Sequence, residues 1–126
     1  MIRSRMGFVL LVVLLAMSLL ATGLMTRIHE PIEADLQTAA EYARKGNWVQ
    51  AHRFFRQAEA AWTRWEHLRA CFADHNPVEE IDAAFIQVQV YGTAREELAF
   101  EGGCRELARK VAAVGQAHEF VWWNLL

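Results

Sequence analysis

The chain has 126 residues, a formal net charge of −2 and two cysteines. This length accommodates one small domain. Hydrophobic residues make up 54% of the chain, compared with ~45–50% in typical soluble domains. The composition excludes a disordered chain, a collagen-like chain and a disulfide-dense scaffold.

The charge is distributed unevenly. Arg3, Arg5 and Arg27 flank an apolar run, and the part from residue 28 onward holds ten Lys and Arg against fifteen Asp and Glu, a net charge of −5. Nucleic-acid binding requires clustered cations that neutralise phosphates. We therefore expect no nucleic-acid partner.

The apolar run extends from Met6 to Met25, 20 residues without a charged side chain. An α-helix rises ~1.5 Å per residue, so this run spans ~30 Å, the hydrocarbon thickness of a bilayer. Basic residues precede the run, and the positive-inside rule therefore predicts a cytoplasmic N-terminus and an extracytoplasmic C-terminal domain. We expect a single-pass protein attached to the cytoplasmic membrane through residues 6–25.

A cleaved signal peptide is the alternative interpretation. Ala21-Thr22-Gly23 is a small-x-small sequence of the kind that signal peptidases cleave. The run is longer than a typical signal-peptide core and continues through Leu24 and Met25, which favours an uncleaved signal-anchor. Both interpretations export the rest of the chain. We assign residues 1–27 to the transmembrane helix and residues 28–126 to the exported domain.

The exported part has helical spacing. Glu30-Pro31 predicts the start of a first helix and Lys45-Gly46 its end, and Asn47 is a suitable cap for a second helix. The second helix is the strongest signal in the chain, because aromatic residues and alanines recur at steps of three and four. They are Trp48, Ala51, Phe55, Ala58, Trp62 and Trp65, and Phe72 extends the stripe.

Two further helices follow. Asn76-Pro77-Val78-Glu79 has the pattern of a capping box at the start of a helix, although residues 86–90 also alternate like a strand. Gly102-Gly103 predicts a break before a last helix that ends at Trp122-Trp123. We therefore predict an all-α fold with one N-terminal transmembrane helix followed by a small antiparallel bundle of about four helices.

The sequence lacks the usual catalytic patterns. Its only serines, Ser4 and Ser18, lie at the anchor, and no phosphate-binding loop or haem attachment motif is present. No histidine completes the Glu-x-x-His motif of di-iron bundles. The paired carboxylates have the positions of helix caps and solvated faces. We expect a non-enzymatic protein without a cofactor.

One histidine and cysteine spacing suggests an alternative. His67, Cys71 and His75 stand at i, i+4 and i+8 on the predicted second helix. An i, i+4 pair can chelate one metal ion, but the third residue is rotated by ~80°. The alternative function is a small exported metal- or cofactor-binding bundle. The simpler interpretation is a partly buried cysteine between solvated histidines.

The two cysteines and the C-terminal tryptophan pair each allow two interpretations. Cys71 and Cys104 can form one disulfide outside the cytoplasm, or they can be small buried hydrophobes. Trp122 and Trp123 are consecutive, so their side chains point ~100° apart on a helix. One of them can pack in the core while the other lies at the membrane interface or contacts a partner.

The sequence from Ala43 to Ala51, followed by Phe55 and Ala58, resembles the turn and second helix of a tetratricopeptide repeat. The likeness covers about half a repeat, and no second copy follows at ~34 residues. It implies a helical hairpin and leaves a peptide-binding fragment as a third functional hypothesis.

The whole chain also resembles a family of short bacterial proteins known as domain of unknown function 4363. The shared features are the N-terminal membrane segment, the Gly46-Asn47-Trp48-x-x-Ala51 turn, Trp62 or Trp65, and His75 before Ile81. The resemblance implies location and architecture and no activity. We therefore expect a membrane-anchored helical interaction module that binds an unknown protein partner or self-associates.

Overall fold

The structure is a computed structural model that describes residues 2–66 and 75–125. These residues form four helices and no strand: α1 (Ile2–Arg44), α2 (Trp48–Arg64), α4 (His75–Thr93) and α5 (Glu97–Leu125). The predicted all-α fold, with an N-terminal apolar helix followed by a helical bundle, is confirmed.

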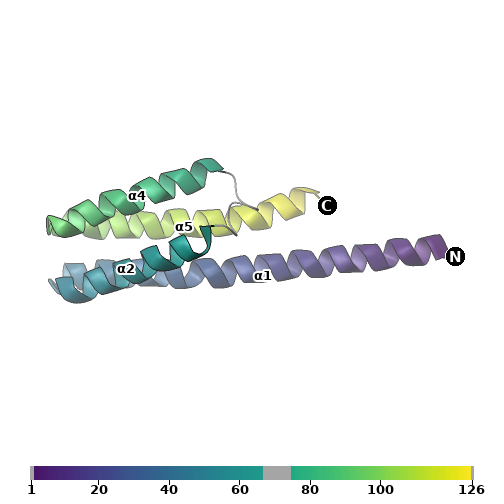
Figure 1. The fold of residues 1–126 in the computed structure, drawn as a ribbon, viewed down its shortest axis with the longest axis horizontal. Coiled ribbons are helices and arrows are strands. Elements are labelled where there is room, and N and C mark those ends of the chain that lie inside the picture. Colours follow the sequence, from purple (N-terminus) through teal and green to yellow (C-terminus); the bar gives the residue numbers. More distant parts are fainter. Residues whose placement is uncertain (1, 67–74, 126) are drawn as a thin grey trace.

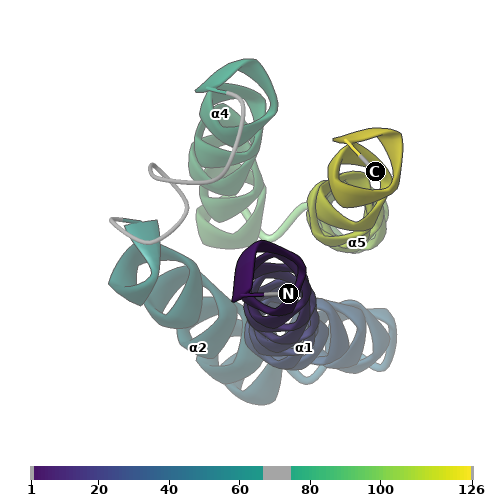
Figure 2. The same ribbon diagram turned by 90° about the vertical axis from the view of Figure 1, so that its right-hand side faces the viewer.

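The helices run alternately up and down along one long axis (Figure 1). α1 packs most extensively against α5 and α2, and α4 packs against α5 (Figure 2). The backbones of α2 and α4 have few close contacts, and aromatic side chains connect these two helices. The Phe85 ring centroid lies 5.9 Å from that of Phe55 and 6.1 Å from that of Trp62.

The first helix differs from the prediction, because α1 is one continuous helix of 43 residues with Pro31 inside it. The predicted helix start at Glu30-Pro31 is therefore wrong. Proline inside a helix costs about 3 kcal/mol. Here Pro31 is exposed, while Ile32 and Leu36 on the buried face of the same helix are fully buried. Burial of that face stabilises the helix across the proline.

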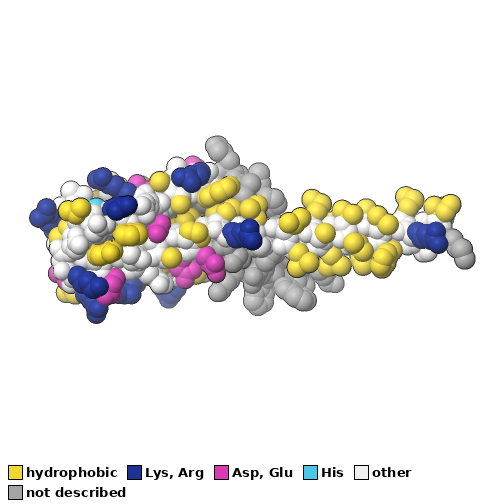
Figure 3. Space-filling view, turned by 90° about the horizontal axis from the view of Figure 1, so that it is seen from below, with side chains coloured by type: hydrophobic (Ala, Val, Ile, Leu, Met, Phe, Trp, Pro, Cys, Tyr) yellow, Lys and Arg dark blue, Asp and Glu magenta, His cyan; other side chains and the backbone are white. Residues whose placement is uncertain are grey.

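The N-terminal part of α1 extends away from α2 and α4 (Figure 1). Ile2–Leu20 has a mean hydropathy of 1.9, and none of it is buried. Its surface is hydrophobic on the side shown in Figure 3, with basic side chains at both ends. It is long and apolar enough to cross a membrane, a property that signal sequences share.

The bundle core begins at Ile28 on α1 and includes residues from all four helices. Fully buried alanines at positions 39, 40 and 43 of α1 and 51 and 58 of α2 let these two helices approach closely. Larger side chains fill the space toward α4 and α5. The largest fully buried side chains are Ile32, Leu36, Ile81, Phe100, Cys104, Leu107 and Val111.

The turn between α1 and α2 has the predicted form. Gly46 adopts φ +77°, and its N–H donates to the Ala43 carbonyl at 3.0 Å, while the Asn47 N–H donates to the Tyr42 carbonyl at 2.9 Å. The Asn47 side chain accepts from the Gln50 N–H at 3.3 Å. The two backbone bonds from Gly46 and Asn47 form a Schellman motif. They close the predicted helical hairpin.

The turn between α4 and α5 lies earlier than predicted. Arg95 occupies the left-handed position with φ 54°, and the N–H groups of Arg95 and Glu96 donate to the Gly92 and Tyr91 carbonyls at 3.1 and 3.0 Å. The break predicted at Gly102-Gly103 is wrong, because both glycines lie inside α5. An arginine in this left-handed conformation costs about 1–2 kcal/mol. Arginine is therefore not a residue that predicts a turn from the sequence.

The structure also differs from the prediction at the end of α2 and settles the conformation of residues 86–90. α2 ends at Arg64 with Trp65 as its C-cap, well before the predicted end near residue 75, and Phe72 lies outside the described residues. Residues 86–90, which alternate like a strand, lie inside α4.

The two glycines of α5 have different surroundings. A Cβ atom at Gly103 would lie 2.7 Å from Cγ2 of the buried Val88, whereas a Cβ atom at Gly102 would meet nothing within 4 Å. Gly103 therefore permits the close approach of α4 and α5. Gly102 has no such role and only weakens the helix.

We expect Gly102→Ala to raise the free energy of unfolding by about 0.5–1 kcal/mol, the usual gain in helix propensity. Gly103→Ala should lower it by about 1–2 kcal/mol, because overpacking against Val88 outweighs that gain. Urea unfolding of the detergent-solubilised protein, followed by circular dichroism, measures both changes. Equal effects of the two substitutions would contradict this account of the α4–α5 contact.

Candidate functional site

A polar and aromatic cluster lies where the bundle core meets the projecting part of α1. It contains His29 of α1, Trp62 of α2 and Asp82 of α4, and Gly115 of α5 lies against it. All four described helices thus contribute one residue. We call this group the junction cluster.

Trp62 connects two of these helices. Its side chain is buried, and its indole N–H donates to Oδ1 of Asp82 at 2.6 Å. Asp82 is exposed, so its carboxylate remains in contact with water while it accepts this bond. Because the backbones of α2 and α4 pack only weakly against each other, the bond fixes their relative position at this end of the bundle.

His29 is the only buried polar or charged residue among those whose burial is described. Its ring lies edge-on to Trp62, with the centroids 6.2 Å apart and the planes at 68°. A Cβ atom at Gly115 would lie 3.6 Å from the His29 ring, an ordinary van der Waals distance, so this part of α5 lies beside the imidazole. His29 thus packs between α2 and α5 directly after the apolar run.

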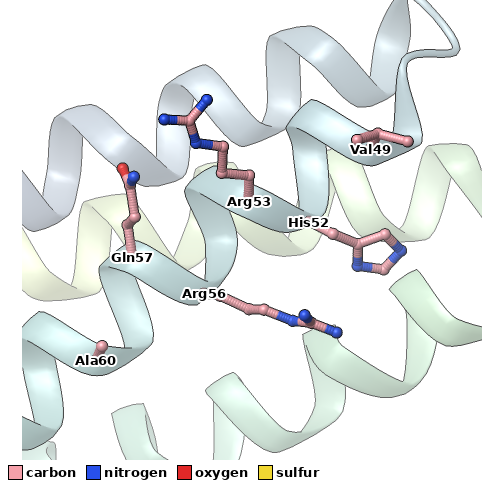
Figure 4. Close-up of a pocket in the computed structure, with 6 residues that line it drawn as sticks. All are labelled: Val49, His52, Arg53, Arg56, Gln57 and Ala60. Atoms are coloured by element: carbon pink, nitrogen blue, oxygen red, sulfur yellow. The ribbon is translucent and has the colours of Figure 1, made fainter.

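The outer face of α2 forms a shallow depression on the bundle surface (Figure 4). Arg53 and Arg56 extend from it in different directions, so their guanidinium groups do not converge on one ligand. The half-buried His52 lies at its edge, with its ring 5.8 Å from Trp48 and 6.1 Å from Phe100. Because α2 alone lines the depression, it lacks the enclosure of a small-molecule site.

Three large apolar side chains of α4 and α5 are exposed. Ile86 and Val90 on the outer face of α4 are 65% and 60% exposed, and Leu98 at the start of α5 is 84% exposed. Leu98 also lines a groove between α4 and α5 together with Tyr91 and Gly102. Because these three side chains are largely exposed, they are available to a partner surface.

The end of the bundle far from the apolar run is held by ion pairs. Glu41 accepts from Arg44 at 2.7 Å and from Arg105 of α5 at 3.5 Å, and Arg105 also lies 3.4 Å from Glu101. The hydrogen bond from Arg44 is the main reason that the pKa of Glu41 lies below its usual value. The side chains of Glu41, Arg44 and Arg105 are exposed, and exposed ion pairs contribute little to stability.

Cys104 is a free thiol on the core face of α5 with no exposed surface. Burial raises its pKa to about 12. The thiolate, which is the reactive form, is therefore scarce at neutral pH. Cys104 matches the interpretation of a small buried hydrophobe, while Cys71 lies outside the described residues.

The proposed metal ligands are not brought together in the part of the chain that the structure describes. His67 and Cys71 lie outside the described residues, and His75 is the first residue of α4 and does not belong to α2. Trp122 and Trp123 belong to the last turns of α5, and their side chains are not described. The roles considered for all five residues stay predictions.

Sequence reasoning missed the junction cluster. Trp62 belongs to the predicted core stripe of α2, but Asp82 has the pattern of a solvated acid, and no motif includes His29. The one available clue was spacing: His29 shares the buried face of α1 with Ile32 and Leu36. Asp82 could not be assigned because its partner is 20 residues away in the sequence.

We expect Asp82→Ala to lower the free energy of unfolding by about 1–2 kcal/mol, because the Trp62 N–H loses a charged acceptor. Asp82→Asn should cost less, since the amide retains an acceptor oxygen at this place. Glu80→Ala, which removes an exposed acid of the same helix, is the control and should have little effect. Thermal unfolding compares the three variants, and equal stability of the two alanine variants would contradict a role for the bond.

We expect Cys104 to resist alkylation by iodoacetamide at pH 8 in the folded protein and to react readily in denaturant, because burial keeps the thiol protonated and inaccessible. Peptide mapping by mass spectrometry reports Cys104 separately from Cys71. Rapid labelling of Cys104 under native conditions would contradict its burial at the centre of α5.

The comparisons with known proteins give a family for most of the chain. The model of a family described as a domain of unknown function (DUF4363) matches residues 21–125, which include the bundle and the end of the apolar run. No curated relative matches the chain, and no solved structure does. Because the matched region covers most of the chain, this protein belongs to the DUF4363 family.

Proposed function

We propose that the chain is a single-pass membrane protein whose helical domain lies outside the cytoplasm and close to the bilayer. In this proposal the domain acts through contacts with a protein partner or with a second copy of itself, and it carries out no chemistry. The observation that carries the proposal is the continuity of α1, which joins the exposed apolar run to the bundle core in one helix.

The continuity of α1 brings the bundle close to the membrane. The apolar run ends at Met25, and the core begins at Ile28. Three residues of helix correspond to ~4.5 Å. If residues 6–25 span the bilayer, the junction cluster is therefore next to the membrane surface, and α1 determines the tilt of the bundle.

The same continuity favours an uncleaved anchor. The small-x-small sequence at residues 21–23 lies inside α1. Proteases bind their substrates in an extended conformation, so cleavage at this site requires local unwinding of the helix. The basic residues before the run and the exposed Glu30 after it support an N-terminus in the cytoplasm.

The exposed apolar side chains support a role in protein contacts. Ile86 and Val90 lie one turn apart on the outer face of α4, and Leu98 lies on the rim of the α4–α5 groove. Protein interfaces are built around apolar centres with polar rims. Gln89 lines a shallow depression together with Val90, and Gln87 and Glu106 line the α4–α5 groove together with Leu98.

The test uses the full chain expressed in a bacterial host. We expect it to remain in membranes after extraction at pH 11, to keep its N-terminal residues by intact mass, and to expose its bundle to protease in spheroplasts but not in inside-out vesicles. Loss from the membranes, or a bundle protected in spheroplasts, would overturn the proposed location.

Partner contact is tested in the same membranes. A photo-crosslinking residue at Val90 should give an adduct of one discrete mass, whereas the same residue at the exposed Arg109 of α5 is the matched control and should give none. Absence of an adduct at Val90 would contradict the interaction role. One tightly bound metal equivalent that His75→Ala removes would contradict it in favour of a metal-binding bundle.

A further inference from the structure

α5 continues well past its last described core residue. The core residue of α5 nearest its C-terminal end, among those described, is Val114, and Gly115 lies level with His29 of α1. α5 nevertheless continues as a helix to Leu125. Figure 1 shows this end reaching past α2 and α4 toward the N-terminal half of α1.

The pairing of Gly115 on α5 with His29 on α1 shows which residues of α1 lie at the same height as the C-terminal end of α5. α5 and α1 run in opposite directions and rise ~1.5 Å per residue. Trp122 lies seven positions after Gly115, ~10 Å further along the axis, and is therefore level with about residue 22 of α1. This level falls within the last turn of the apolar run that ends at Met25.

The composition of α5 changes at the same place. The 16 residues after Lys110 contain one formal charge, Glu119, and the final segment is Phe120-Val121-Trp122-Trp123-Asn124-Leu125-Leu126. Tryptophan concentrates at membrane–water interfaces, because its ring is apolar and its N–H is polar. A tryptophan pair at this level of the bilayer matches that preference.

We propose that residues 118–125 of α5 enter the outer membrane–water interface and that Trp122 and Trp123 anchor them in the lipid. The ligand of this surface is the lipid bilayer. The proposal rests on the proposed function, because it requires residues 6–25 of α1 to span the membrane. The bundle is then attached at two places, and rotation about the axis of α1 is restricted.

The test places the full-length protein in phosphatidylcholine vesicles that contain lipids brominated near the carbonyl end of the acyl chains. Bromine quenches tryptophan fluorescence at short range. We expect quenching in the wild type, and we expect Trp122→Phe with Trp123→Phe to remove most of it. Trp48→Phe is the matched control, because Trp48 lies beside the α1–α2 turn, ~27 Å from Met25 along the helix axis.

The outcomes separate the two proposals. Unchanged quenching in the double variant, with the protein still floating with the vesicles, would overturn the interfacial anchor and leave the transmembrane helix intact. Failure of the wild type to float with vesicles would overturn the proposed function itself. Circular dichroism confirms that both variants retain the helical content of the wild type, so a change in quenching reports position in the bilayer.

Discussion

The structure depends on one helix that serves two environments. Between Met6 and Met25, α1 carries no charged side chain, and none of Ile2–Leu20 is buried. From Ile28 onward the same helix buries only one face, and this face contacts both α2 and α5. A helix can change surroundings in this way without a break, because its backbone hydrogen bonds are internal in either environment. Pro31 removes one of these bonds, and the buried residues of the same helix stabilise it at this point.

The rest of the bundle is arranged around this helix by close contacts between small residues. Alanines bring α2 against α1, and Gly103 brings α4 against α5. The remaining pair, α2 and α4, has few backbone contacts and is joined by the Phe55, Phe85 and Trp62 rings and by the bond from Trp62 to Asp82. This bond lies at the end of the bundle next to the apolar run, the place where the position of the helices matters most if α1 is a membrane anchor.

Local signals predicted the features that depend on neighbouring residues. Gly46 and Asn47 marked the first turn because each has a defined backbone or capping role, and the Trp48-to-Trp62 stripe marked the buried face of α2. The predictions of a helix start at Glu30-Pro31 and of a break at Gly102-Gly103 were wrong, because packing of the helices outweighs the intrinsic preference of these residues. Nothing in the sequence marked the turn at Arg95. The junction cluster could not be predicted, because it joins residues from four helices that are far apart in the sequence.

The central claim is that α1 crosses from the apolar run into the bundle as one helix. Spin labels placed singly at residues 18–34 of the full-length protein in lipid nanodiscs test this claim most directly. The account predicts that mobility and oxygen accessibility vary with a period of 3.6 residues through residues 25–31, and that accessibility to oxygen falls after Arg27. Loss of this periodicity between the apolar run and Ile32 would show a flexible joint and would contradict the account.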